Sequence, residues 1–71
     1  MNGTMLDEQK RLKELVGTQF REKSTDTYWR VVSVYHNIYK DVCLKIVTVT
    51  GKSMELVEGS EDYYTKFERV D

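Results

Sequence analysis

Proline is absent from the 71-residue chain, cysteine and histidine occur once each, and the four glycines are scattered singly. A lone cysteine, Cys43, excludes the disulfide framework on which many small secreted domains depend. Cys43 and His36 supply only two of the four ligands that a structural zinc site needs, so we expect no metal site. Isolated glycines also build no phosphate-cradling loop, and no cofactor is expected.

Long apolar runs and a strong net charge are missing as well. No stretch approaches membrane-spanning length and no signal-peptide pattern opens the chain, so we expect a cytoplasmic protein with no membrane partner. The net charge is −1, which provides no overall attraction to nucleic acid. Residues 1–52 carry nine Lys/Arg against six Asp/Glu, whereas residues 53–71 carry two against six.

The segment 4–16, TMLDEQKRLKELV, has the period of an amphipathic helix. Thr4 and Asp7 have the spacing of a capping box, and Gly17 follows as a C-terminal stop. We therefore predict a helix at about 4–16 after a disordered tail at 1–3. A helix of about 13 residues is marginal alone in water, so it must dock on the rest of the chain or on a partner.

After Gly17 the pattern changes to that of β-strands. Runs rich in β-branched and aromatic residues, separated by short polar turns, predict strands near 18–22, 28–35, 42–49, 53–57 and 63–70. Apolar residues change parity within 42–49, which predicts a β-bulge there. The pattern predicts a single domain that is mainly β, with one N-terminal α-helix and five antiparallel strands in a small barrel. The residues expected in the interior are Phe20, Val32, Val34, Leu44, Ile46, Leu56 and Phe67.

This series of strands resembles an SH3-like small β-barrel protein of the short bacterial and phage type, many of unknown function. The resemblance covers residues 17–70. It rests on the segments GTQF (17–20), YWRVVSV (28–34), VCLKIVTVTG (42–51), MEL (54–56) and SEDYYTKFERV (60–70). It implies a five-stranded antiparallel SH3-like barrel over about 18–70. The ALYDY-type motif of proline-peptide-binding SH3 domains is missing, so the resemblance does not imply that activity.

Catalytic residues are not predicted. Cys43 and His36 are the residue types of a nucleophile and its base, but no third group that would orient the base is identifiable. Cys43 also falls in a strand that is expected to be core, where a free cysteine behaves as a small apolar side chain. The carboxylates between Glu55 and Asp62 lie on one exposed stretch with nothing to desolvate them. We therefore expect that the protein is not an enzyme.

Aromatic residues are concentrated in the stretch TDTYWRVVSVYHNIY, residues 25–39. Tyr28 and Trp29 are adjacent in a strand, so their rings point to opposite faces, and which of them is exposed stays open. Ile38 and Tyr39 lie in a polar loop, where a large apolar side chain gains little from local packing.

Two functions remain open beside a purely structural role in an assembly. The first is a non-enzymatic protein-binding module that acts as a monomer or weak homodimer, of the kind that phage and mobile elements encode as regulators or inhibitors of a host protein. Its candidate binding residues are Ile38, Tyr39, Tyr35, Glu58, Glu61 and Asp62. The alternative is RNA or single-stranded DNA binding on a barrel face, in which tyrosine rings stack on bases. The cations expected at its phosphates are Arg30, Lys40, Lys45 and Lys52. The near-neutral charge favours the protein-binding module.

Overall fold

The computed structural model describes residues 10–70. Its elements are a helical segment at 10–15, β1 (Gln19–Glu22), β2 (Thr27–His36), β3 (Val42–Val47), β4 (Ser53–Val57), α2 (Glu61–Thr65) and β5 (Phe67–Arg69). The tail predicted at 1–3 and the first part of the helix predicted at 4–16 lie outside the described residues. The last turns of that helix are present at 10–15.

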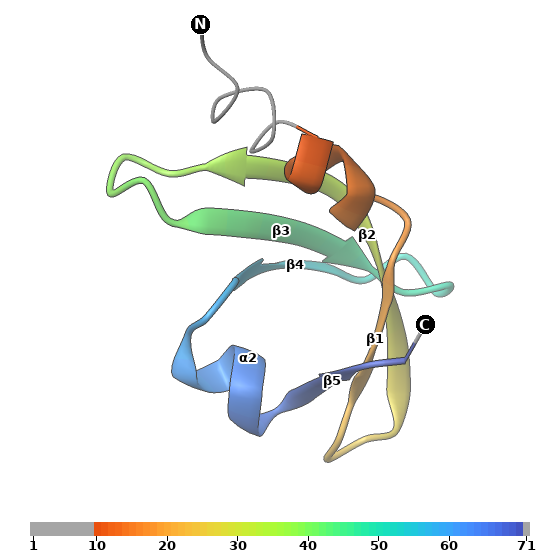
Figure 1. Cartoon of the computed structure of the whole chain (residues 1–71). Helices are drawn as coiled ribbons and strands as arrows, with labels where there is room; N and C mark the ends of the chain where they lie inside the picture. Colours follow the sequence, from red (N-terminus) through yellow and green to blue (C-terminus); the bar gives the residue numbers. More distant parts are fainter. Residues whose placement is uncertain (1–9, 71) are drawn as a thin grey trace, which may run out of the picture.

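The five strands form one antiparallel sheet in the order β4-β3-β2-β1-β5. The prediction of a mainly β chain with five antiparallel strands is therefore confirmed. The sheet is not closed into a barrel, because β4 and β5 form the two edges of the sheet that the structure describes. Figure 1 shows that the sheet bends strongly: β3 and β4 cross the upper part of the molecule, β5 crosses the lower part, and α2 connects the two.

β2 contains one extra residue where it pairs with β3. Val31 lies opposite Ile46, and the next aligned pair is Ser33 with Lys45, so Val32 has no counterpart in β3. A bulge of this kind bends its strand and increases the local twist. The first part of β2 therefore pairs with β1 and the second part turns away to pair with β3.

The bulge decides which valines of β2 are buried. Val31 is fully buried and Val34 packs against the core, whereas Val32 is 43% exposed. The prediction that Val32 lies in the interior was wrong. The predicted position of the bulge in 42–49 was wrong too, because the shift of register lies in β2. The run VVSV (31–34) has apolar residues at both odd and even positions. The extra residue therefore cannot be recognised from the alternation of apolar and polar residues.

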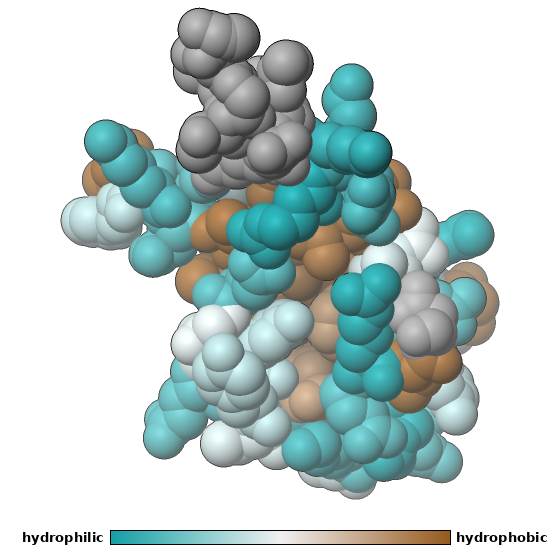
Figure 2. All heavy atoms as spheres, viewed as in Figure 1, coloured by the Kyte–Doolittle hydropathy of each residue, from teal (hydrophilic) through white to brown (hydrophobic). Residues whose placement is uncertain are grey.

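A single apolar core lies between the bent sheet, the helical segment 10–15 and α2. Five residues predicted to be interior are buried: Phe20, Leu44, Ile46, Leu56 and Phe67. Leu15 brings the helical segment into the same cluster. Of the adjacent rings in β2, Trp29 is buried and Tyr28 is 56% exposed. Figure 2 shows the molecule from the same side as Figure 1, with apolar side chains in the middle and polar and charged ones around them.

The last predicted strand, 63–70, is only partly a strand. Residues 61–65 form α2, and β5 is limited to Phe67–Arg69. The helix begins because the Ser60 side chain accepts a hydrogen bond from the N–H of Tyr63 at 3.2 Å, and two carboxylates follow in its first turn. A serine followed by Glu-Asp is a recognisable helix start, and it marks the boundary that the strand pattern obscures.

Contacts from both helices connect the two parts of the bent sheet. Tyr63 of α2 meets Phe20 of β1 edge-on, with ring centroids 5.7 Å apart. Arg11 in the helical segment donates to the carboxylate of Glu58, just after β4, at 3.2 Å. The exposed ion pair contributes little to stability, so the apolar contacts hold the layers together.

Truncation to alanine should have different effects at Ile46 and at Val32, which lie near the bulge. Ile46→Ala leaves a cavity in the fully buried core and should cost about 2–4 kcal/mol. Val32→Ala removes a half-exposed side chain and should cost less than about 1 kcal/mol. Urea unfolding followed by Trp29 fluorescence measures both variants. Equal midpoints for the two would contradict the core described above.

Candidate functional site

The β2–β3 connection, residues 37–41, is a turn that its own side chain holds in place. Asn37 Oδ1 accepts hydrogen bonds from the backbone N–H groups of Tyr39 at 2.8 Å and Asp41 at 3.0 Å. The N–H of Lys40 donates to the carbonyl of Asn37 at 3.0 Å, and Lys40 has φ of 66°, in the left-handed region. The turn is therefore ordered by local polar contacts and needs no packing against the core.

This ordered turn exposes two large apolar side chains. Ile38 is 88% exposed and Tyr39 is 76% exposed. We name Ile38 and Tyr39 together the hairpin tip. Neither side chain belongs to the core cluster, so both present apolar surface to solvent. Tyr35, the third predicted apolar contact, lies farther down β2 opposite Cys43 and is 39% exposed.

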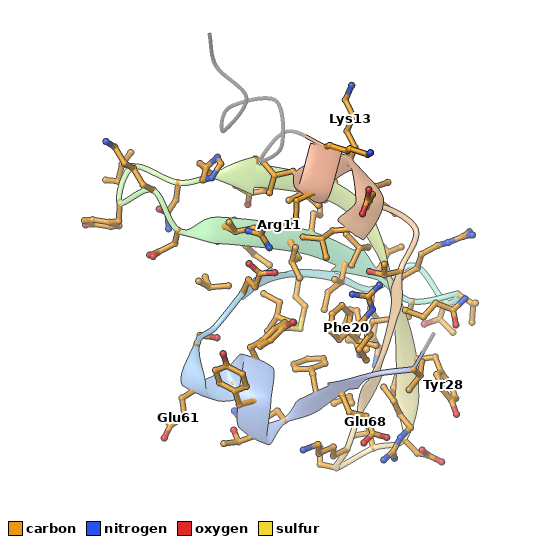
Figure 3. The ribbon with its side chains drawn as sticks, in the orientation of Figure 1. Arg11, Lys13, Phe20, Tyr28, Glu61 and Glu68 are labelled. Carbon is orange, nitrogen blue, oxygen red and sulfur yellow. The ribbon has the colours of Figure 1, made fainter. Side chains whose placement is uncertain are left out.

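The predicted acidic contacts divide into two positions. Glu58 lies next to the 37–41 turn, because its N–H donates to the carbonyl of Val42, the first residue of β3, at 2.9 Å. Glu61 and Asp62 lie in the first turn of α2, and Asp62 is paired with Lys66 at 3.5 Å. Figure 3 shows Glu61 pointing outward from α2. Glu58 thus adjoins the hairpin, while Glu61 and Asp62 form a separate acidic position beyond β4.

Tyr63 of α2 is partly buried against the core beside these carboxylates. Burial raises the pKa of the Tyr63 phenol above its ordinary value of 10, and the charge of Glu58 raises it further. The phenol therefore stays neutral through the physiological range. It contributes packing against Phe20 rather than charge.

The four cations of the nucleic-acid alternative do not form one patch. Arg30 and Lys45 project from the same face of the sheet, Lys52 lies in the β3–β4 turn, and Lys40 lies in the hairpin at the other end of β3. Lys45 also lies opposite Glu55 of β4, which offsets its charge.

A shallow groove of about 410 Å³ lies beside Arg30. Its lining residues are Gln19, Tyr28, Trp29, Arg30, Val47, Thr48 and Val49. Arg30 carries the sole charge in this lining, and the exposed Tyr28 ring borders it. The groove therefore combines an aromatic face with a cation.

Cys43 and His36 are not arranged as a nucleophile and a base. Cys43 is aligned with Tyr35, and His36 is aligned with Val42, so the two occupy adjacent rungs of the ladder and project from opposite faces. Cys43 is fully buried, and its Sγ lies 3.8 Å from the carbonyl of Asp41. Among residues 10–70, no group of three His, Cys, Asp or Glu side chains is placed to hold a metal ion.

Comparison with known proteins adds no family to this description. No protein-family model, no curated protein and no solved structure matches the chain. No helix in the described part of the chain is long and apolar enough to cross a membrane.

The residue that reasoning from the sequence missed is Asn37, which orders the turn without being exposed as a contact itself. The available signal was an asparagine two positions before Tyr39 and four before Asp41, the spacing at which its side chain reaches both backbone N–H groups. The sequence left open whether Tyr28 or Trp29 is exposed; Tyr28 is the exposed one, and it lines the groove beside the buried Trp29.

Removal of the Asn37 side chain should loosen the turn. Asn37→Ala loses two hydrogen bonds and should cost about 1–2 kcal/mol, whereas Asn37→Asp retains an acceptor oxygen and should cost less. Amide hydrogen exchange at Tyr39 and Asp41 measures the local effect directly. Unchanged exchange at both amides in Asn37→Ala would show that the turn is ordered by other contacts.

Proposed function

We propose that this protein is a non-enzymatic protein-binding module that uses the hairpin tip as its anchor. The observation that carries the proposal is the exposure of Ile38 and Tyr39 on a turn ordered by Asn37. Burying such side chains at an interface contributes about 1.5–3 kcal/mol each from the removal of apolar surface from water. Because the turn is already ordered, little further conformational entropy is lost on binding.

Glu58 provides a charged rim beside the hairpin tip. It lies next to the 37–41 turn, and its ion pair with Arg11 leaves its side chain partly exposed. An apolar anchor beside a charged rim is the usual anatomy of a protein interface. Tyr35, Glu61 and Asp62 extend the proposed contact surface away from the tip.

We further propose an SH3-like barrel kinship for the fold and a cytoplasmic regulator or inhibitor of a host protein, of the phage or mobile-element type, for the role. The order β5-β1-β2-β3-β4, with a short helix between β4 and β5, supports the first proposal. The small size and the single anchoring turn support the second, in which the protein acts as a monomer or weak homodimer by covering a surface of its target.

A second candidate function is binding of RNA or single-stranded DNA in the groove beside Arg30. The observation that favours it is the lining of this groove, in which an exposed Tyr28 ring accompanies one cation and no carboxylate. A base could stack on the ring while Arg30 meets a phosphate. The scattered placement of Lys40 and the pairing of Lys45 with Glu55 weigh against a strong site.

The hairpin-tip proposal predicts a loss of binding without a loss of stability. A pull-down from host lysate with the full chain first identifies the partner. The double variant Ile38→Ser with Tyr39→Ser should then weaken binding by about 2 kcal/mol, roughly 30-fold, and should melt within a few degrees of the parent. Val49→Ser is the matched control, because Val49 is fully exposed on the β3–β4 turn and should leave binding unchanged. Equal losses for the two changes would refute a specific tip.

The nucleic-acid candidate predicts affinity that falls steeply as salt rises, because neutralised phosphates release counterions. Fluorescence anisotropy with labelled single-stranded oligonucleotides at low salt measures this affinity. Tyr28→Ala and Arg30→Gln should each reduce the affinity for the oligonucleotide. Lys40→Gln should not, because Lys40 lies in the β2–β3 turn, away from the groove. Absence of binding at low salt removes this candidate.

A further inference from the structure

β4 forms an edge of the sheet, and the pattern of hydrogen bonds shows which of its backbone groups face outward. Thr48 N–H donates to the carbonyl of Lys52 at 2.9 Å, and Glu58 N–H donates to the carbonyl of Val42 at 2.9 Å. Between these two bonds the antiparallel ladder alternates. The even-numbered residues of β4 therefore bond to β3, and Ser53, Glu55 and Val57 direct their N–H and C=O groups away from the sheet.

Part of this edge is already closed by the chain itself. The carbonyl of Val57 accepts the N–H of Ser60 at 3.1 Å, at the turn into α2. Within residues 10–70, the sheet order places no strand beside the remaining groups of Ser53 and Glu55 or the N–H of Val57. These groups form a row at which one more strand could pair.

A groove of about 310 Å³ lies along this edge, beside the row of outward-facing backbone groups. Its lining residues are Met54, Glu55, Leu56, Val57, Ser60, Glu61 and Asp62. Met54 is 38% exposed and offers an apolar contact on the core side of the strand. Glu55, Glu61 and Asp62 contribute three carboxylates, of which Asp62 is paired with Lys66 and Glu55 lies opposite Lys45 of β3. Backbone, apolar surface and negative charge therefore occur together along β4.

We propose that this edge binds an extended, basic peptide segment of a partner protein, which adds to the sheet as a sixth strand beside β4. The inference rests on the proposed protein-binding function and names the chemistry of the partner. Main-chain hydrogen bonds to Ser53 and Glu55 hold the segment. A Lys or Arg side chain of the segment lies beside the Glu55 carboxylate and provides the specificity for a basic sequence. Neighbouring residues of the segment, which point to the other face, are apolar and contact Met54.

Charge separates this occupant from a second copy of the chain. Two β4 strands pairing antiparallel about Glu55 would place two like carboxylates side by side, which is unfavourable on a sheet. A charged side chain on an exposed edge is also a common protection against self-association. The same Glu55 that opposes pairing of two copies attracts a basic strand.

The test uses the ¹⁵N-labelled full chain and two nine-residue probe peptides. One alternates Lys with Val, and the other has Glu in place of Lys. The Lys peptide should shift the amide signals of Ser53, Glu55 and Val57, slow their hydrogen exchange, and bind at least about tenfold more tightly than the Glu peptide. Glu55→Lys should reverse this preference. Glu14→Lys, at an exposed position of the helical segment 10–15, is the control and should leave the preference for the Lys peptide in place.

A second variant separates pairing of the backbone from charge alone. Glu55→Pro removes an outward N–H that makes no bond to β3, so the ladder keeps its bonds while the edge loses a donor. It should abolish the slowed exchange, and its amide spectrum shows whether the fold is kept. If it does not fold, Glu55→Gln should retain the protection at reduced affinity.

Equal binding of both peptides, shifts confined to other surfaces, or pairing of two copies through β4 would each overturn the inference. The double variant of Ile38 and Tyr39 should bind the Lys peptide like the parent. Failure of the hairpin tip as an anchor is therefore distinguishable from failure of the β4 edge.

Discussion

The extra residue at Val32 in β2 is the constraint on which the rest of the structure depends. β2 pairs along its first part with β1 and along its second part with β3, and Arg30 is aligned with both Gln19 and Val47. One strand therefore belongs to both halves of the sheet. The bulge bends it, so that the core side chains on either side of Val32 point into the same interior. Without this bend a chain of 71 residues would have only one flat apolar face to cover.

A core enclosed in this way explains why the two proposed contact surfaces stay exposed. The bent sheet, the helical segment 10–15 and α2 bury Phe20, Trp29 and Ile46 together. The hairpin tip lies beyond that core and is ordered by Asn37 instead of by packing. The edge of β4 is left because the sheet stays open between β4 and β5. Both proposed contact surfaces are consequences of how the core is built.

The sequence predicted the strands well because their β-branched and aromatic runs are separated by short polar turns. It predicted the bulge in the wrong strand, because Val31, Val32 and Val34 present apolar side chains on both parities. It missed α2, since Tyr63 and Tyr64 fit a strand equally well until the Ser60 cap is noticed. The exposed positions of the hairpin tip were predicted, as a loop offers an apolar residue little packing. The β4 edge could not be predicted, because it depends on strand order.

Deletion of Val32 tests the role of the bulge most directly. The side chain of Val32 is half-exposed and dispensable, but its backbone supplies the extra residue. Removing it shifts one part of β2 by one residue relative to its partner strand, which turns buried side chains of that part to the opposite face. The account predicts that the deletion variant loses cooperative thermal unfolding or melts far below the parent, while Val32→Ala melts close to it. A deletion variant that melts within a few degrees of the parent would contradict the account.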